Sequence, residues 1–367
     1  MKESLRVAVT GYGRMGEIHA EVWSSIPGVR LVAIADPDPL RWRAAFERYA
    51  KSGCRFFALG EDMLKAEQPD IVVVATQAPD HCRNVLAAIE HGCHVICEKP
   101  MAPTLEEADA MVDAARRSPS FLAVHHQTIF TDAVTRAREM LRSGEIGKLY
   151  YIEGWCKGRP APYDLMEVGG HILHLILYFA VGLRHYVPIE VFGDVRDMSR
   201  GRAPWYDALP GSARPIDELY PQGRPCGIGV GDYLFGYYKF KDGIRAALRL
   251  ATLGSESHEF MAVELHGTKG RLRIHQTQTG RLFFKPTPHD TLDTMAWQEV
   301  VGTWNPDPKW IVPTRRFAED FLDAIRIKRE PAVPEAAGRL VLEMTLGIYS
   351  SHFAGKPLSI PLEDRKY

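Results

Sequence analysis

Short apolar runs alternate with longer amphipathic stretches over the first third of the chain. A run of almost wholly apolar residues indicates a buried strand, and apolar residues at every third or fourth position indicate a helix. Among the expected helices, residues 104–117 open with Thr104 as N-cap and Glu107 three residues on. The expected strands are residues 5–10, 29–35, 55–58, 70–75, 94–97 and 121–125. This alternation predicts a parallel sheet built of βαβ units.

The pattern changes after residue 125, where strand-like segments follow one another directly. These segments are residues 148–157, 187–195, 233–240, 244–253, 259–266 and 271–275, and a final short strand is expected at 358–361. Glycine or Asp-Gly turns separate several of them, which is typical of an antiparallel sheet. Further helices are expected at 167–183, 314–328 and 335–354, and a long loop at 199–231. We therefore predict an α/β fold, with a Rossmann domain at 1–125 and an α/β domain with a large, mainly antiparallel sheet at 126–367.

Length and composition agree with two domains and exclude several partners. The chain has 367 residues, and its net charge of −1 provides no basic excess for nucleic acid or an anionic membrane surface. No run approaches the roughly 20 apolar residues of a membrane helix, and the N-terminus does not resemble a signal peptide. The six cysteines are scattered without a Cys-x-x-Cys motif. Reduced thiols and a cytoplasmic location are therefore expected.

A glycine-rich turn follows the first expected strand and opens a helix. It reads Gly11-Tyr12-Gly13-Arg14-Met15-Gly16, the spacing of a dinucleotide-binding loop. The first glycine permits a tight turn, the second lets a pyrophosphate approach the backbone, and the third allows close packing of helix on strand. The alternative is a glycine-rich turn of another kind of α/β protein.

An acidic residue stands where such a site contacts the adenosine ribose. Asp36 ends the second expected strand, 20 residues after Gly16. A carboxylate there accepts hydrogen bonds from a ribose diol and repels a 2′-phosphate. The adjoining Pro37-Asp38-Pro39 contains no basic residue, and Arg41 fits a helix surface. The cofactor is therefore predicted to be NAD rather than NADP.

A lysine follows the fifth expected strand, in Glu98-Lys99-Pro100. Ligands of open α/β sheets bind beyond the carboxyl ends of the strands, so Lys99 is placed to meet a substrate beside the cofactor. An amine in that position can exchange a proton with a substrate hydroxyl. Spacing alone leaves open that Lys99 is a surface lysine before a turn.

Several motifs together resemble the Gfo/Idh/MocA family, the relatives of glucose–fructose oxidoreductase and inositol dehydrogenase. The motifs span nearly the whole chain, and the Glu-Lys-Pro element is the most specific of them. They are Gly11-x-Gly13-x-x-Gly16-x-x-His19, Ala75-Thr76 followed by His81, residues 92–100 ending in Glu98-Lys99-Pro100, Gly144-x-Ile146-Gly147 and Gly267-Thr268-Lys269-Gly270.

The resemblance implies a function and its residues. The protein would transfer a hydride between NAD and a secondary hydroxyl of a sugar, a sugar derivative or a cyclitol, as a homodimer or homotetramer assembled through the second domain. Lys99 and His171 would handle the proton, and Glu167 would orient His171. His126, Trp155 and His174 would face the substrate. The cofactor would be bound by Gly11, Tyr12, Gly13, Arg14, Met15, Gly16, Asp36, Ala75, Thr76, His81, Glu98 and Lys99.

Three polar residues share one face of the expected helix at 167–183. Glu167, His171 and His174 stand at positions i, i+4 and i+7. The family usually has an aspartate where this chain has His174, and it usually has an arginine shortly after the sixth strand, where this chain has His125-His126-Gln127. Two histidines and a carboxylate also suit a divalent metal, although the resemblance implies no metal. His174 alternatively packs between helix and sheet.

Two other function classes stay open at this point. Some relatives retain NAD and oxidise a sugar transiently. The protein could in the same way be a glycosidase, lyase or epimerase that turns over without added NAD. A non-catalytic nucleotide or sugar sensor would use the same scaffold. Such a sensor has no need of a proton-transfer pair, which Lys99 and His171 would provide.

Overall fold

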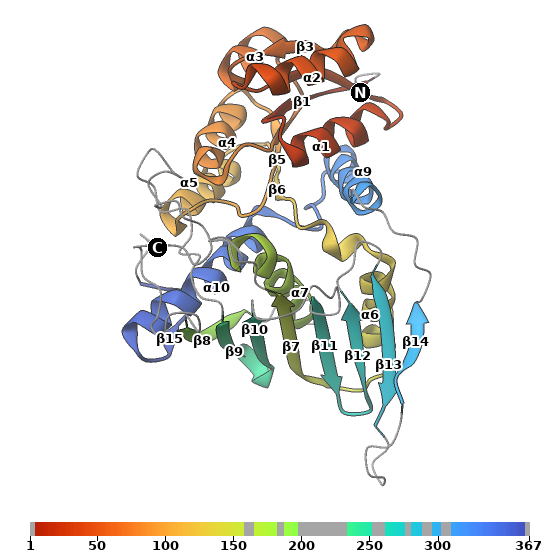
Figure 1. Ribbon diagram of the computed structural model, residues 1–367, viewed down its shortest axis with the longest axis vertical. Helices are drawn as coiled ribbons and strands as arrows, with labels where there is room; N and C mark the ends of the chain where they lie inside the picture. The colour runs from red at the N-terminus through yellow and green to blue at the C-terminus, as the bar shows by residue number, and fades with distance from the viewer. Residues whose placement is uncertain are drawn as a thin grey trace. The chain divides into compact units, whose positions relative to one another are not determined.

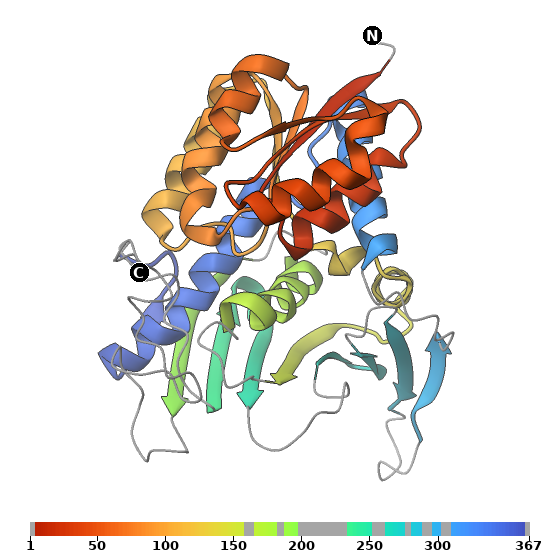
Figure 2. The ribbon, with the colours of Figure 1, turned by 45° about the horizontal axis from the view of Figure 1, so that its top comes forward.

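The structure is a computed structural model in which the chain forms two compact units. They are Met1–Gln127 with Lys309–Arg339, and Thr128–Pro308 with Leu340–Tyr367 (Figures 1 and 2). The expected boundary at residue 125 lies close to the end of the first segment, but no sequence pattern indicated that residues 309–339 belong with the first unit. The residues described are 4–157, 165–181, 187–196, 233–251, 261–275, 280–287, 296–301 and 310–363. The loop expected at 199–231 lies outside them.

A six-stranded sheet forms the first unit, in the order β3-β2-β1-β4-β5-β6. Every neighbouring pair is parallel, which confirms the Rossmann fold. The strand order reverses beside β1, and ligands of such sheets bind beyond the carboxyl ends of the strands at that reversal. The strands are β1 (Leu5–Thr10), β2 (Val29–Ala35), β3 (Arg55–Phe57), β4 (Ile71–Val74), β5 (His94–Cys97) and β6 (Leu122–Val124).

Helices connect these strands. Thr104 caps α5 as predicted, since its side chain accepts a hydrogen bond from the Glu107 N–H. The sequence pattern did not indicate α3, which has eight residues, too few for a clear helical period. The helix α9, which comes from the segment 309–339, lies beside α1 although the two are distant in sequence (Figure 1). The helices are α1 (Arg14–Ser24), α2 (Pro39–Tyr49), α3 (Gly60–Glu67), α4 (His81–Glu90), α5 (Leu105–Arg116) and α9 (Ile311–Ile327).

A nine-stranded sheet forms the second unit, in the order β14-β13-β12-β11-β7-β10-β9-β8-β15. All neighbouring pairs are antiparallel except β7 with β10, which confirms a mainly antiparallel sheet. The sequence pattern did not indicate β13 and β14. The strands are β7 (Leu149–Lys157), β8 (Pro188–Arg196), β9 (Tyr233–Phe240), β10 (Arg245–Ala251), β11 (Ala262–Gly267), β12 (Gly270–His275), β13 (Arg281–Pro286), β14 (Gln298–Val301) and β15 (Leu358–Ser359).

One helix of the second unit lies directly on its sheet. A Cβ atom at Gly154 of β7 would stand 2.4 Å from Ile172 and 3.0 Å from Ile176, so only a glycine allows this approach. The helix that carries both isoleucines is α7 (Gly170–Val181), and a π-helical turn, η4 (Leu165–Gly169), precedes it. The other helices that contribute to this unit are α6 (Asp132–Arg142) and α10 (Glu335–Ala354).

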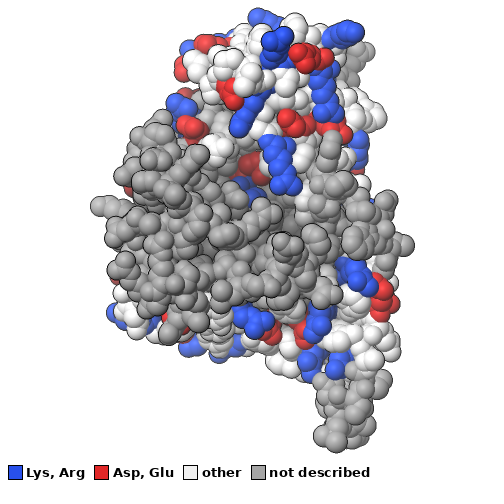
Figure 3. All heavy atoms as spheres, in the orientation of Figure 1, with Lys and Arg blue, Asp and Glu red and all other residues white. Residues whose placement is uncertain are grey.

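The surface carries charges of both signs. On the face that Figure 3 shows, basic and acidic side chains are interspersed over the described part of the first unit. Among the helices of the described residues, none is long and apolar enough to span a membrane. Five of the six cysteines lie in the described part, and all five are buried free thiols.

Candidate active site

The glycine-rich loop joins β1 to α1 at the carboxyl edge of the six-stranded sheet. The Gly11 N–H donates to the Ala35 carbonyl at 2.8 Å and fixes the start of the loop beside β2. Gly13 is the N-cap of α1 and has no side chain that could accept a hydrogen bond from the first turn. The N–H groups of that turn and the helix dipole therefore provide a site for an anion, such as a pyrophosphate.

The three glycines of the loop meet different surroundings. Gly11 has a φ of +86°, and a Cβ atom there would lie 2.5 Å from the Ala75 carbonyl oxygen. A Cβ atom at Gly16 would lie 2.0 Å from the Gly11 carbonyl oxygen. At Gly13 the nearest group is the flexible Arg41 guanidinium, at 3.2 Å. Backbone contacts thus require the first and third glycines, whereas the space over the second remains available to a ligand.

The Asp36 carboxylate is held beside this loop. It is buried and accepts hydrogen bonds from the Tyr12 N–H at 2.6 Å and the Asp38 N–H at 2.8 Å. Arg41 is exposed on the surface of α2, as the sequence indicated, and its guanidinium also lies 4.0 Å from Asp36 and 3.6 Å from Asp38, close to the loop. Tyr12 is buried, and burial raises the pKa of its phenol to about 12. Of the other predicted loop residues, Arg14 is exposed and Met15 is half-buried.

A buried histidine joins the turns that follow β4 and β5. The His81 ring nitrogens lie 2.9 Å from the Pro100 carbonyl oxygen and 3.1 Å from the Thr76 carbonyl oxygen. Burial lowers the pKa of His81. A neutral imidazole has one N–H, so His81 donates a hydrogen bond to one of these carbonyls while its other nitrogen contacts the second, and the ring lies between the two turns. Cofactor binding by its ring stays a prediction. Ala75 and Thr76 are half-buried in the first of the turns.

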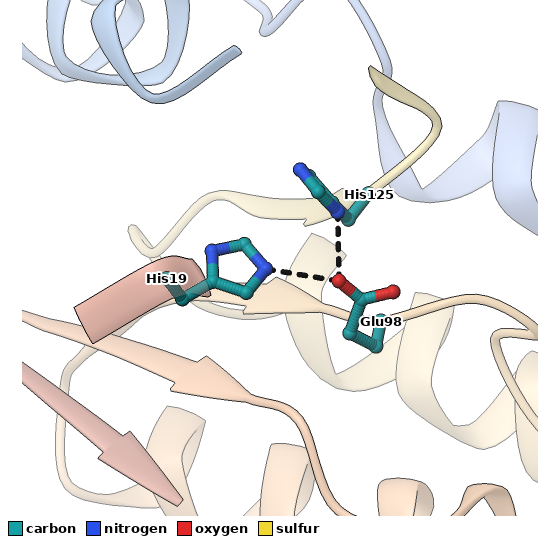
Figure 4. A group of neighbouring side chains, drawn as sticks. All are labelled: His19, Glu98 and His125. Carbon is teal, nitrogen blue, oxygen red and sulfur yellow. Dashed lines mark hydrogen bonds and ion pairs between the residues drawn. The ribbon is translucent and has the colours of Figure 1, made fainter. Parts of the chain in front are cut away.

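The Glu98 side chain forms the centre of a buried cluster (Figure 4). Its Oε1 accepts hydrogen bonds from His19 Nε2 at 2.9 Å and from His125 Nδ1 at 2.7 Å. Its Oε2 lies 3.2 Å from the Lys99 backbone N–H. Burial opposes the charge of Glu98, but the interaction with His125 and the two histidine hydrogen bonds lower the pKa of its carboxyl well below the usual value. Burial lowers the pKa of His19.

The donor atoms of this cluster are those of a metal site, but their spacing fits hydrogen bonds. The three side chains offer ligand atoms within 4.8 Å of one another. In a tetrahedral zinc site with bonds of about 2.0–2.2 Å, ligand atoms lie about 3.3–3.6 Å apart. The Glu98 oxygen is 2.9 Å from His19 and 2.7 Å from His125, within the range of hydrogen bonds to a carboxylate.

Sequence reasoning did not identify two members of the cluster. His19 entered only as part of a motif, and His125 was passed over in favour of its neighbour His126. The signal that could have identified them is their position in the chain: α1, which carries His19, begins at the ligand-binding edge, and His125 directly follows β6, which ends there. The structure places the His125 ring 4.4 Å from the His19 ring and 4.8 Å from the Phe317 ring, measured between centroids.

The predicted substrate-facing residues belong to different parts of the chain. His126 follows β6, is buried, and donates its backbone N–H to the Val124 carbonyl at 2.7 Å. Trp155 is half-buried on β7, and the Arg273 guanidinium lies 5.7 Å from its ring centroid. Their contact with a substrate stays a prediction.

The helix expected at 167–183 begins later than its pattern indicated. Glu167 lies in the π-helical turn η4, and the α-helix starts only at Gly170. The expected α-helical spacing between Glu167 and His171 is therefore wrong, because a π-turn has a different period. The Glu167 side chain lies outside the described residues. His171 and His174 are one turn apart on α7, with His171 half-buried and His174 buried.

The buried His174 predicts a loss of stability in acid. Burial lowers its pKa from 6.5 to about 3, so the folded protein keeps it neutral while the unfolded chain protonates. Its contribution is complete above pH 6.5 and is lost as the pH falls toward 3, by about 1.4 kcal/mol per pH unit. We expect the unfolding free energy of His174→Leu, measured in urea between pH 7 and 4, to depend less steeply on pH than that of the wild type. Equal slopes would contradict this assignment.

The parallel sheet, the glycine loop and Asp36 define a dinucleotide-binding protein of the Rossmann type. The chain belongs to the Gfo/Idh/MocA oxidoreductase family. Residues 5–126 match the family's NAD-binding Rossmann fold, and residues 138–360 match its C-terminal alpha/beta domain.

Named relatives and solved structures agree with this membership. The chain is 31% identical over 189 residues to D-glucoside 3-dehydrogenase of Escherichia coli K12, covering 47% of this chain and 53% of the relative. It is 25% identical over 289 residues to levoglucosan dehydrogenase of Pseudarthrobacter phenanthrenivorans, covering 74% and 73%. The matches to the most similar curated relatives span about half of their length or less. A structure of levoglucosan dehydrogenase with NADH and L-sorbose has the same fold, with a TM-score of 0.78, 20% identity, and coverage of 98% of this chain and 99% of that one.

Proposed function

We propose that the protein is an NAD(H)-dependent dehydrogenase that acts on a secondary hydroxyl of a sugar, a sugar derivative or a cyclitol. The observation that carries the proposal is the position of Lys99. It follows β5 at the sheet edge that also carries the glycine loop and Asp36, and its backbone N–H contacts the buried Glu98. Relatives named for glucoside, levoglucosan and inositol oxidation support the substrate class.

The residues of the first unit fit a bound dinucleotide. The α1 N-terminus and the position over Gly13, which only the flexible Arg41 side chain approaches, suit the pyrophosphate, and Asp36 suits the ribose hydroxyls. Bound NAD supplies the acceptor for the hydride that leaves the carbinol carbon. In the proposed mechanism, Lys99 and His171 receive the proton of the hydroxyl, and Glu167 orients His171. His126, Trp155 and His174 complete the substrate side.

A substrate panel tests this function. The purified protein is first treated with acid to release and identify any bound nucleotide. It is then incubated with sugars and cyclitols, with and without added NAD, while NADH absorbance and product are both followed. We expect NADH formation that depends on added NAD. Product without net NADH would contradict a dehydrogenase and indicate an enzyme that retains its cofactor. Nucleotide binding without turnover of any panel member would indicate a sensor.

Asp36 and Arg41 predict the preference for NAD and how it can be changed. We expect Asp36→Ser to lower the ratio of kcat/KM for NAD to that for NADP by about 10- to 100-fold, or about 1.4–2.8 kcal/mol. The reason is that the buried carboxylate no longer repels a 2′-phosphate, while the nearby Arg41 guanidinium attracts it. Steady-state kinetics with both cofactors measure the ratio.

The double variant Asp36→Ser/Arg41→Ala is the matched control for this prediction. It should lose the gained use of NADP, because the attracting cation is gone. Full NADP activity in the double variant would show that Arg41 takes no part in cofactor choice.

We further propose a homodimer or homotetramer that assembles through the open face of the nine-stranded sheet, in the cytoplasm. A Cβ atom at Gly236 of β9 would clash with Ile348 of α10, so its neighbours Phe235 and Tyr237 face away from that helix. Both side chains are half-buried. Half-buried aromatic residues on an open sheet suit a subunit interface. Light scattering of the purified protein gives the mass, and a monomer would refute the assembly.

A further inference from the structure

The Glu98 carboxylate binds two buried histidines (Figure 4) and also contacts the backbone N–H of Lys99. The two histidines come from separate elements, His19 from α1 and His125 from the residue after β6, whereas Lys99 directly follows Glu98 in the chain. The exposed fraction is 1% for His19, 4% for Glu98 and 0% for His125. None of the three side chains is therefore accessible from solvent. They can influence a substrate only through the residues that they contact.

Each carboxylate oxygen has a different partner. Oε1 accepts the N–H groups of His19 and His125, at 2.9 and 2.7 Å. Oε2 faces the Lys99 N–H at 3.2 Å. A buried carboxylate needs such donors, because it has no water to replace them. The two histidines thus hold the carboxylate in one orientation, and the carboxylate in turn holds the backbone nitrogen of Lys99.

The same turn has a second attachment on the other side of Lys99. His81 contacts the Pro100 carbonyl at 2.9 Å and the Thr76 carbonyl at 3.1 Å. The backbone is therefore fixed before Lys99 by Glu98 and after it by His81. The Lys99 side chain is half-buried and extends from a backbone held at both ends.

We propose that Glu98, oriented by His19 and His125, is a positioning residue for Lys99. The inference rests on the proposed function, in which Lys99 exchanges a proton with the substrate hydroxyl. Glu98 does not itself touch the reacting atoms. It fixes the Lys99 backbone, so that the side-chain amine, in its neutral form, reaches the hydroxyl proton in one geometry. A displacement of about 1 Å is enough to slow such a reaction by about 100-fold.

Glu98→Gln tests this role with almost no change in volume. If the amide oxygen accepts both histidine N–H groups, the amide NH₂ faces the Lys99 N–H, so two donors oppose each other. If the amide is turned round, its NH₂ meets the histidines instead. In either orientation at least one hydrogen bond of the cluster is lost, and Lys99 is less firmly held.

The expected result is a selective loss of turnover. Glu98→Gln should lower kcat by about 10- to 100-fold while KM and the Kd for NAD change by less than about threefold. Hydrogen exchange of the peptide that contains Lys99 and Met101, followed by mass spectrometry, should become faster. Glu343→Gln is the matched control, because Glu343 is also buried and accepts a backbone N–H, from Leu362 at 2.8 Å. It should leave kcat unchanged.

Several outcomes would overturn the proposal. Unchanged kcat together with unchanged exchange at Lys99 would refute it, as would equal losses of kcat in Glu98→Gln and Glu343→Gln. If Glu98→Gln does not fold, His125→Asn removes one hydrogen bond only, and a smaller loss of the same kind is then expected. Full turnover by Lys99→Ala would refute the function proposed for Lys99. The exchange measurement would still decide whether Glu98 holds its backbone.

Discussion

Replacing Lys99 by alanine should lower kcat by about 10²- to 10⁴-fold and leave the Kd for NAD nearly unchanged. The range is that of a group that transfers a proton in the rate-limiting step. Lys99 follows β5 at the carboxyl edge of the parallel sheet, where ligands of this fold bind. Its backbone is held by the neighbouring Glu98. NAD binding should persist, because the glycine loop and Asp36 are intact.

Lys99→Arg separates charge from proton transfer. Arginine keeps a cation but does not release its proton in proteins, so turnover should stay low. Stopped-flow measurement of NADH formation gives the rate of the chemical step, and titration followed by protein fluorescence gives the Kd. Lys99→Ala with turnover equal to the wild type would exclude Lys99 from the reaction. Full activity in Lys99→Arg alone would limit its role to electrostatics.

Gly16→Ala should lower the free energy of unfolding by about 1–3 kcal/mol and weaken the binding of NAD. The added Cβ atom would stand 2.0 Å from the Gly11 carbonyl oxygen. That oxygen belongs to the backbone and cannot rotate away, so α1 has to move relative to β1. The displaced helix then presents its first N–H groups to the pyrophosphate in the wrong place. Urea unfolding and NAD titration measure the two effects.

Gly13→Ala is the control for this prediction. A Cβ atom there meets only the Arg41 guanidinium at 3.2 Å, and a flexible side chain can move aside. The stability of the apoprotein should therefore stay close to that of the wild type. NAD binding should still weaken, because the methyl group occupies the space where the pyrophosphate approaches the backbone. Equal losses of stability in the two variants would contradict the different roles of these glycines.

Local sequence patterns predicted those elements that depend on residues only a few positions apart in the chain. The Val-rich run of β4 and the capping pair Thr104 and Glu107 each carry their signal within a few residues. The glycine loop and Asp36 were found for the same reason, since a fixed spacing follows from the geometry of one βαβ unit. The helix α3 has only eight residues, too few for a clear period. The strand β14 is as short as β4 but mostly exposed, so it lacks the buried apolar run that identified β4.

The Glu98 cluster shows what local patterns cannot provide. His19 is separated from Glu98 by 79 residues, and His125 by 27. Their meeting depends on the order of strands in the sheet. The π-helical turn before α7 was also missed. Polar residues at positions i, i+4 and i+7 do not distinguish a π-turn from the first turn of an α-helix.

The placement of α9 has a consequence for the order in which the protein matures during synthesis. The helix lies beside α1 and contributes Phe317, whose ring packs edge-on against His125 with centroids 4.8 Å apart. When only the first 127 residues have left the ribosome, the nucleotide-binding unit therefore still lacks α9. Its hydrophobic surface under α9 stays uncovered while nearly two hundred further residues are translated. The nascent chain carries this uncovered surface throughout that interval, and exposed hydrophobic surface of this kind favours aggregation until α9 is made.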